Sequence, residues 1–283
     1  MISNRAPIIS VLVVLLELWL VSCATPDAVS KFCGSATSTL AAAAPIFDDM
    51  KQSCLREVNS RNEFATFTPP IQNEGNCSLI GDQAKSAAAA AKILSEYFTA
   101  INSVASFGTS KAGTDAQKLL SEATALGGAN SATQTALGSI AQFLVSAATS
   151  GYRQIQLEKD LSKASGDVPI VVTALVTIVR DDYIGRQLLS EEQKLSDQYR
   201  EFARNKSPEL TLMLDGRWHA DEQGIAARRA SAQNLVIALE TLSKGFTDLA
   251  TNSHHLKAKE LAGLLEPYAA QLQTLVPQIQ KAF

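Results

Sequence analysis

A cluster of side chains that could bind a metal lies in the last third of the chain. Asp215, His219, Asp221 and Glu222 occur within eight residues, and imidazole and carboxylate groups are suitable metal ligands. The same residues suit the first turns of a helix, because acidic groups there are stabilised by the helix dipole. A zinc-binding helix carries two histidines four residues apart, and this stretch has one. We therefore expect a charged helix start and no metal site.

Carboxylates also gather between residues 167 and 204. Arg180-Asp181-Asp182 and Glu191-Glu192 lie in one predicted helix, and paired carboxylates can act as general acids and bases when they face a cleft. Asp182 and Arg186, however, stand at the i,i+4 spacing of ion pairs on helix surfaces. This spacing favours a solvated, salt-bridged face over a catalytic pair.

Signatures of enzymes and of nucleotide-binding proteins are missing from the sequence. It contains no Gly-x-Ser-x-Gly, no His-Glu-x-x-His and no Gly-Lys-Ser/Thr phosphate loop. His254 and His255 are adjacent, so on a helix they point in different directions and cannot easily share a metal. The net charge of −3 provides no basic surplus for binding nucleic acid. We predict a protein that is not an enzyme, has no cofactor or metal, and does not bind nucleic acid.

The elements that would position these residues are predicted to be helices almost throughout. The chain is 46% hydrophobic but only 6% aromatic, and its apolar residues recur every three or four positions, which is the helical period. Asp167 and Pro169 suit the first turn of a helix. We therefore interpret the apolar run Val168–Val179 as the buried first half of a helix rather than a strand. The predicted helices cover about 27–61, 82–107, 114–126, 131–165, 167–204, 219–250 and 253–283.

Local signals set the details of these predictions. Pro45 should kink the first helix, and Asp82 can cap the second. Ser207-Pro208-Glu209 should start only one or two helical turns, which end at Asp215-Gly216. Long helices joined by short turns predict an all-α fold, an elongated up-and-down bundle of six to seven helices over residues 31–283.

The N-terminus has the residue pattern expected of an export signal. Arg5 precedes an apolar run from Ile8 to Val21, which has the length of the hydrophobic region of a signal peptide. The run ends in Leu20-Val21-Ser22-Cys23, which resembles the lipobox of bacterial lipoproteins. This resemblance implies cleavage before Cys23, a diacylglycerol on its thiol and an acylated amino group. The alternative is an ordinary signal peptide cut after Ala24, because Ser22-Cys23-Ala24 also fits a small-x-small site.

The lipobox reading divides the chain into a signal peptide (1–22), a lipidated tether (23–30) and the bundle. Several acyl chains would hold the protein stably on a bilayer. An Asp directly after the lipidated cysteine retains enteric lipoproteins in the inner membrane, and Ala24 occupies that position here. The expected location is therefore the bacterial cell envelope, with the outer membrane favoured over the inner membrane.

The remaining cysteines predict one disulfide. Cys33 and Cys54 lie on one predicted helix, about 30 Å apart at 1.5 Å per residue, so they cannot bond to each other. Cys77 lies after a loop that could fold back onto that helix. A Cys54–Cys77 disulfide is the preferred pairing and Cys33–Cys77 the second. The leftover thiol should be a buried, small apolar group.

Two functions are compatible with these observations. The first is a lipid-anchored, non-enzymatic envelope protein whose helical bundle binds a protein partner or acts as a scaffold. The second is a membrane-active, pore-forming-like exported protein in which the region 168–179 inserts into a target bilayer. Both have the membrane as a partner, the first through lipid on Cys23.

Overall fold

The fold was taken from a computed structural model, which describes residues 24–60, 75–105, 116–123, 131–147, 159, 161–204, 206–252 and 258–283. Within these ranges the chain is helical and contains no β-strand. This confirms the prediction of an all-α helical bundle with several long helices. The predicted signal peptide and the lipobox through Cys23 lie outside the described residues.

The first two helices follow each other along one direction and are separated at a proline. Helix α2 covers Ala24–Ala42 and helix α3 covers Ala44–Asn59. Pro45 occupies the first turn of α3, where its missing N–H costs no hydrogen bond, so the predicted kink is a short break at Ala43. The segment expected as a tether is already helical from Ala24, and Val29 is buried.

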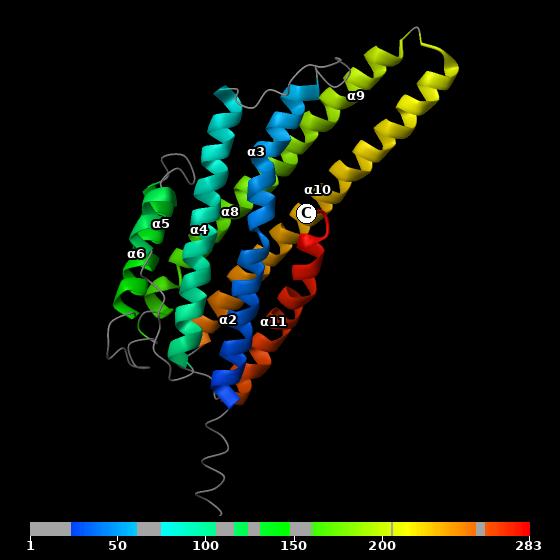
Figure 1. Cartoon of the computed structure of the whole chain (residues 1–283). Helices are drawn as coiled ribbons and strands as arrows, with labels where there is room; N and C mark the ends of the chain where they lie inside the picture. The colour runs from blue at the N-terminus through cyan, green and yellow to red at the C-terminus, as the bar shows by residue number, and fades with distance from the viewer. Residues whose placement is uncertain are drawn as a thin grey trace, which may run out of the picture.

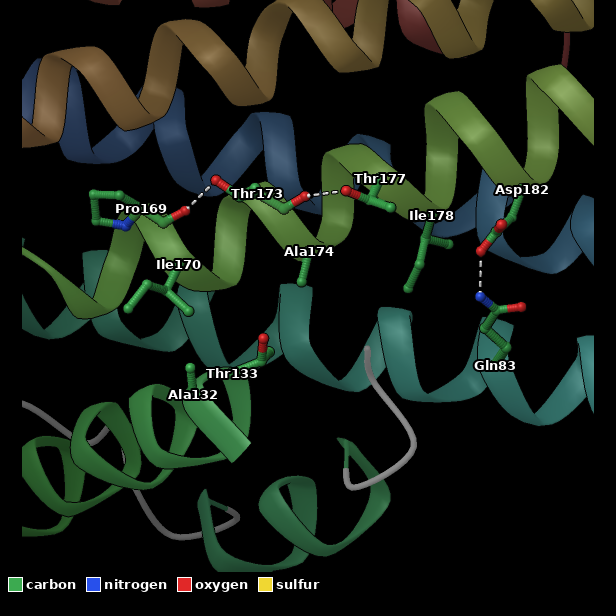
Figure 2. A pocket seen from close by; sticks show the side chains of 10 residues that line it. All are labelled: Gln83, Ala132, Thr133, Pro169, Ile170, Thr173, Ala174, Thr177, Ile178 and Asp182. Carbon is green, nitrogen blue, oxygen red and sulfur yellow. Dashed lines mark hydrogen bonds between the residues drawn. The ribbon is translucent and has the colours of Figure 1, made fainter. Parts of the chain in front are cut away.

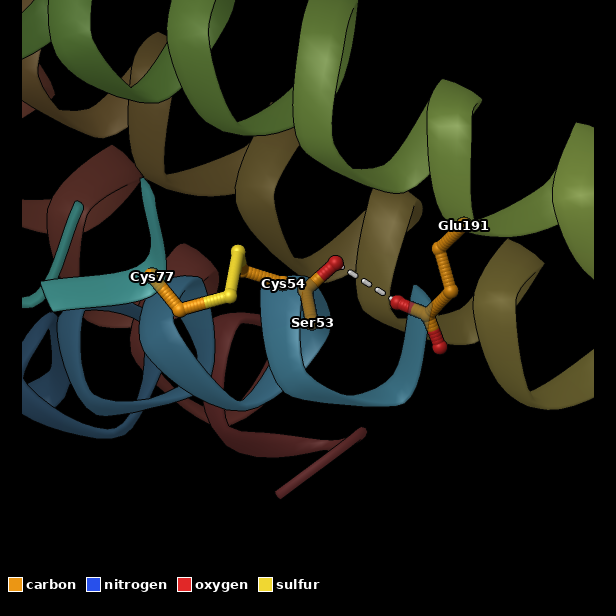
Figure 3. Close-up of a disulfide and its surroundings, with 4 residues drawn as sticks. All are labelled: Ser53, Cys54, Cys77 and Glu191. Carbon is orange, nitrogen blue, oxygen red and sulfur yellow. Dashed lines mark hydrogen bonds between the residues drawn. A yellow bond between two sulfur atoms is a disulfide. The ribbon is translucent and has the colours of Figure 1, made fainter. Parts of the chain in front are cut away.

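Helix α4 covers Gly75–Ala105 and begins seven residues earlier than the predicted cap at Asp82. Asp82 therefore lies inside the helix, and the cap prediction is wrong. The extra turns carry Cys77, whose sulfur is bonded to that of Cys54 in α3 (Figure 3). Cys33 is the free cysteine of the described chain and is fully buried.

Helices α5 (Ala116–Glu122) and α6 (Ser131–Ala147) pack against α4. They are followed by one long helix, built from α8 (Asp167–Thr177), η3 (Ile178–Leu188) and α9 (Leu189–Ala203). The apolar run of α8 is helical and largely buried, as predicted. The segment η3 is a π-helix of 11 residues; π-helices are rare and occur mostly as single turns, often at functional sites.

Helix α10 is continuous from Pro208 to Asn252, a length of 45 residues. The prediction of a short helix ending at Asp215-Gly216 is therefore wrong. Glycine inside a helix costs only about 1 kcal/mol relative to alanine. The buried side chain of Leu214 and the contact between Trp218 and Tyr199 of α9 favour continuing the helix past Gly216.

The last helix, α11 (Ala258–Gln280), contains Pro267 and Pro277 and packs on α2 and α10. Edge-to-face aromatic contacts join α2, α4, α6 and α10 in the core. Gly245 allows the closest approach, because a Cβ at that position would lie 2.5 Å from the Phe32 ring. The aromatic residues of this cluster are Phe32, Tyr97, Phe98, Phe143 and Phe246.

The bundle is elongated, and one hairpin projects beyond it (Figure 1). Helices α9 and α10 meet in a turn that lies past the ends of α3 and α4. The first turn of α2 lies at the opposite end of the molecule, near the first turn of α11. The N-terminal end of the described chain and the tip of the α9–α10 hairpin therefore lie at opposite ends.

Candidate functional site

The predicted cluster near His219 lies on the surface of α10. His219 is more than half exposed, and its Nδ1 lies 3.1 Å from a carboxylate oxygen of Glu222. Its Nε2 lies 3.6 Å from Asp215, whereas Asp221 accepts a hydrogen bond from the Tyr199 hydroxyl. Among the described residues, no group of three or more potential ligands is placed to hold a metal. His254 and His255 lie outside the described residues.

The charged face predicted for residues 180–192 is partly wrong. Asp182 and Arg186 form the expected ion pair, and Glu192 pairs with Arg229 at 2.5 Å. Asp182 and Glu191, however, are buried. The prediction assumed α-helical periodicity, and the i→i+5 bonding of η3 changes which side chains share a face.

Glu191 is the centre of a buried charge cluster. Its side chain is only 3% exposed. One oxygen accepts hydrogen bonds from Arg56 Nε and from an Arg228 guanidinium nitrogen, both at 2.7 Å. The other oxygen accepts from the Ser53 hydroxyl at 2.6 Å, next to the disulfide (Figure 3). A buried carboxylate of this kind is tolerated because each oxygen is paired with a donor.

Asp49 is the second carboxylate of the cluster. Both of its oxygens accept from the Arg56 guanidinium, at 2.9 and 2.7 Å. The Tyr183 hydroxyl donates to Asp49 at 2.6 Å. Burial raises the pKa of Tyr183 above its ordinary value, and the negative charge of Asp49 raises it further. Tyr183 is therefore a neutral hydrogen-bond donor at physiological pH.

The cluster balances its charges, because two arginines face two carboxylates. Burial alone lowers the pKa of Arg56, but the hydrogen bonds to Asp49 and Glu191 outweigh it and raise that pKa overall. The residues come from α3, η3, α9 and α10, so the cluster joins four segments at the base of the hairpin. Its acceptors are engaged with donors from the protein itself, which is the arrangement of a structural junction between these helices.

A groove lies on another side of the same long helix (Figure 2). It encloses about 590 Å³ between α8 and η3 on one side and α4 and α6 on the other. Small-molecule sites typically measure about 300–1,000 Å³. The residues that line it are Gln83, Ala132, Thr133, Pro169, Ile170, Thr173, Ala174, Thr177, Ile178 and Asp182.

The groove has one polar end. There the amide nitrogen of Gln83 donates a hydrogen bond of 2.5 Å to Asp182. Asp182 and Tyr183 are neighbours in η3 but point to different sites, Asp182 into the groove and Tyr183 to Asp49. The π-helical segment thus connects the groove to the charge cluster. The sequence did not predict the groove, because its walls come from segments as far apart along the chain as Gln83 and Asp182.

The tip of the α9–α10 hairpin exposes apolar side chains. Leu212 and Met213 are each 72% exposed; we call these two residues the tip pair. On the adjoining side of the hairpin, a smaller hollow of about 280 Å³ contains Tyr199, Leu214 and Trp218 in its lining. Single exposed apolar residues are common, but Leu212 and Met213 at a projecting end present hydrocarbon over about 100° of the helix surface, where another molecule can make contact.

One helical stretch in the described chain, Leu161–Ala203, which comprises α8, η3, α9 and the turn before them, is long and apolar enough to cross a membrane by length and composition. In its most apolar window, 44% of the residues are buried inside the bundle. Core helices of soluble proteins pass the same test, so this finding alone is weak evidence for a membrane span.

Comparison of the chain with models of protein families, with curated proteins and with solved structures finds no match.

Proposed function

We propose that this chain is a lipid-anchored protein of the bacterial cell envelope, and that it acts as a non-enzymatic binding module. In this proposal the acyl chains are attached to Cys23, at the outer membrane in preference to the inner one. The tip pair, Leu212 and Met213, docks onto an apolar recess of a partner protein in the envelope. The observation that carries the proposal is the position of the tip pair at the end of the molecule opposite the N-terminal helix.

The distance between these two ends supports the proposal. Helix α2 begins at Ala24, one residue after the cysteine of the lipobox. Helix α10 contains 45 residues, which corresponds to about 67 Å at 1.5 Å per residue. An anchor before α2 would leave the hairpin tip at the far end of the bundle from the bilayer (Figure 1). This is the arrangement expected of a protein that reaches for a partner away from its own membrane.

The chemistry of the tip supports a protein partner. Complete burial of a Leu or Met side chain is worth about 1.5–3 kcal/mol. The tip pair contributes little of this to the fold, because both side chains are mostly in solvent. The aromatic residues Tyr199 and Trp218 hold the base of the tip together through a ring contact, so the pair is presented from a rigid support. Preorganised apolar anchors are typical of protein interfaces.

Two measurements test the proposal. Intact mass of the mature protein from a bacterial envelope should show an acylated form that begins at Cys23. A photo-reactive amino acid at position 212 should give a discrete crosslinked adduct in intact cells. The same amino acid at Ile237 is the matched control, since Ile237 is exposed on the same helix about 37 Å away. The charge-introducing variant Met213→Asp should abolish the adduct at position 212 without changing the melting temperature.

Other results would overturn the proposal. An unlipidated form that begins at Thr25 would show that the protein has no lipid anchor at Cys23. Crosslinks of equal yield at positions 212 and 237, or an adduct unaffected by Met213→Asp, would show that the tip pair is not the site that binds a partner. The membrane-active alternative, which has the long apolar helix Leu161–Ala203 in its favour, predicts dye release from liposomes by the purified protein. Inert liposomes would remove that alternative.

A further inference from the structure

The groove beside α8 differs in chemistry between its two ends. Along the helix it extends from Pro169 to Asp182, which is about 20 Å at 1.5 Å per residue. Its volume of about 590 Å³ exceeds that of the hollow at the hairpin tip, about 280 Å³. The space suits an elongated small molecule rather than a single ion.

Most of the groove offers apolar contacts. Ile170, Ala174 and Ile178 present hydrocarbon from successive turns of the helix (Figure 2). The hydroxyls of Thr173 and Thr177 donate to backbone carbonyls four residues earlier, at 2.8 and 3.0 Å. These hydroxyls are therefore already satisfied by the helix. An apolar body placed along this wall would gain burial without breaking hydrogen bonds of the protein.

The polar end offers hydrogen-bond acceptors. The Asp182 carboxylate is 12% exposed and lies in the lining. Gln83 uses its amide nitrogen to donate to Asp182, and its carbonyl oxygen has no hydrogen-bond partner within the described part of the chain. The cation paired with Asp182 is Arg186, whose side chain is 71% exposed. A long, solvated arginine can move toward water when another cation approaches the carboxylate.

We propose that the groove between α8, α4 and α6 binds an amphipathic organic cation, with its ammonium group at Asp182 and Gln83 and its apolar body along Ile170, Ala174 and Ile178. The ammonium donates hydrogen bonds to the carboxylate and to the Gln83 carbonyl, the two acceptors at that end. An anionic headgroup of the same size is repelled by Asp182, and desolvating both negative charges is costly. This site stands apart from the hairpin tip and requires neither the lipid anchor nor the protein partner.

A matched pair of probes tests the proposal: 4-phenylbutylammonium, and 4-phenylbutanoate with the opposite charge. Titration calorimetry would be run at pH 7 on the full chain in a non-ionic detergent, with the detergent alone as reference. The variants are Asp182→Asn and Asp181→Asn. Asp181 is the exposed neighbour of Asp182 in η3 and does not line the groove, so its variant loses the same charge from the protein surface. Ala174→Leu fills the apolar part of the groove.

The expected result is saturable binding of 4-phenylbutylammonium to the wild type and to Asp181→Asn. Asp182→Asn should weaken this binding by about 10-fold or more, because hydrogen bonds to a charged partner contribute that much. Ala174→Leu should also weaken it. The proposal is overturned if the ammonium probe does not bind, if 4-phenylbutanoate binds as tightly, or if Asp182→Asn and Asp181→Asn have equal affinity. Thermal unfolding of each variant shows whether the fold itself is retained.

Discussion

The substitution Glu191→Gln tests the buried charge cluster most directly. It preserves the size of the side chain and removes the negative charge that Ser53, Arg56 and Arg228 share. Asp49 would then be the one carboxylate facing two guanidinium groups. One positive charge in a mostly buried site would have no counter-charge, and its desolvation cost would no longer be offset.

The size of the effect follows from burial. Removing one partner of a buried ion pair costs about 3–5 kcal/mol. The side chain of Arg56 is 37% exposed, so water compensates part of the loss, and the lower end of that range, about 3 kcal/mol, is expected. Glu192→Gln is the matched control. Glu192 is the next residue, and its ion pair with Arg229 is more than a quarter exposed on both sides, so its loss should cost less than about 1 kcal/mol.

Urea unfolding followed by far-ultraviolet circular dichroism measures both variants against the wild type, with the Cys54–Cys77 disulfide kept oxidised. Midpoints are converted to free energies of unfolding with a common denaturant slope. A difference of less than about 1 kcal/mol between Glu191→Gln and Glu192→Gln would refute the reasoning. The cluster would then behave as an exposed ion-pair network, and the burial of Glu191 would not govern its energetics.

Three further predictions concern single side chains. Because the pKa of Tyr183 is raised in the folded chain, the folded chain retains this proton above about pH 10, where the unfolded chain loses it. The stability that Tyr183 contributes is thus fully present below that pH and is lost above it. The loss of stability at high pH, measured by urea unfolding, should be smaller in Tyr183→Phe. Gly245→Ala should destabilise the fold by about 1–3 kcal/mol, because the added methyl group overpacks against Phe32. Gly263→Ala should stabilise the fold by about 0.5–1 kcal/mol, because its methyl group meets nothing within 4 Å. Equal shifts of the melting temperature in the two variants would contradict this. Cys33 is fully buried, and burial raises its thiol pKa, so a maleimide should label it only at the rate of unfolding, and rapid labelling of the native protein would contradict its placement.

The helical periodicity of the sequence was enough to predict the class of fold. Local signals also placed the break near Pro45 and the start of the helix at Asp167 correctly. They failed at Gly216, because a glycine is a weak local signal and the packing of α10 on α9 outweighs it. They failed at Asp82 as well, where the helix begins earlier and carries one half of the disulfide.

The sites were harder to predict than the fold, for two physical reasons. Glu191 is buried because Arg56 and Arg228 reach it from helices far away in the sequence, and no local pattern records such partners. In addition, the π-helical turns of η3 change the periodicity in the middle of a helix. A face assigned from the residues before Ile178 therefore does not continue to Glu191. Asp182 was correctly paired with Arg186 but wrongly placed in solvent.

The π-helical turns of η3 also determine the orientation of the part of the chain that follows them. In an ordinary helix one residue corresponds to about 100° of rotation and 1.5 Å of advance. Deleting a single residue between Ile178 and Leu188 should therefore rotate the part of the chain after it about the helix axis. Glu191 would turn away from Arg56, and the α9–α10 hairpin would project from the bundle in a different direction. The exact number of residues in η3 thus determines the rotational orientation of the α9–α10 hairpin relative to the rest of the bundle.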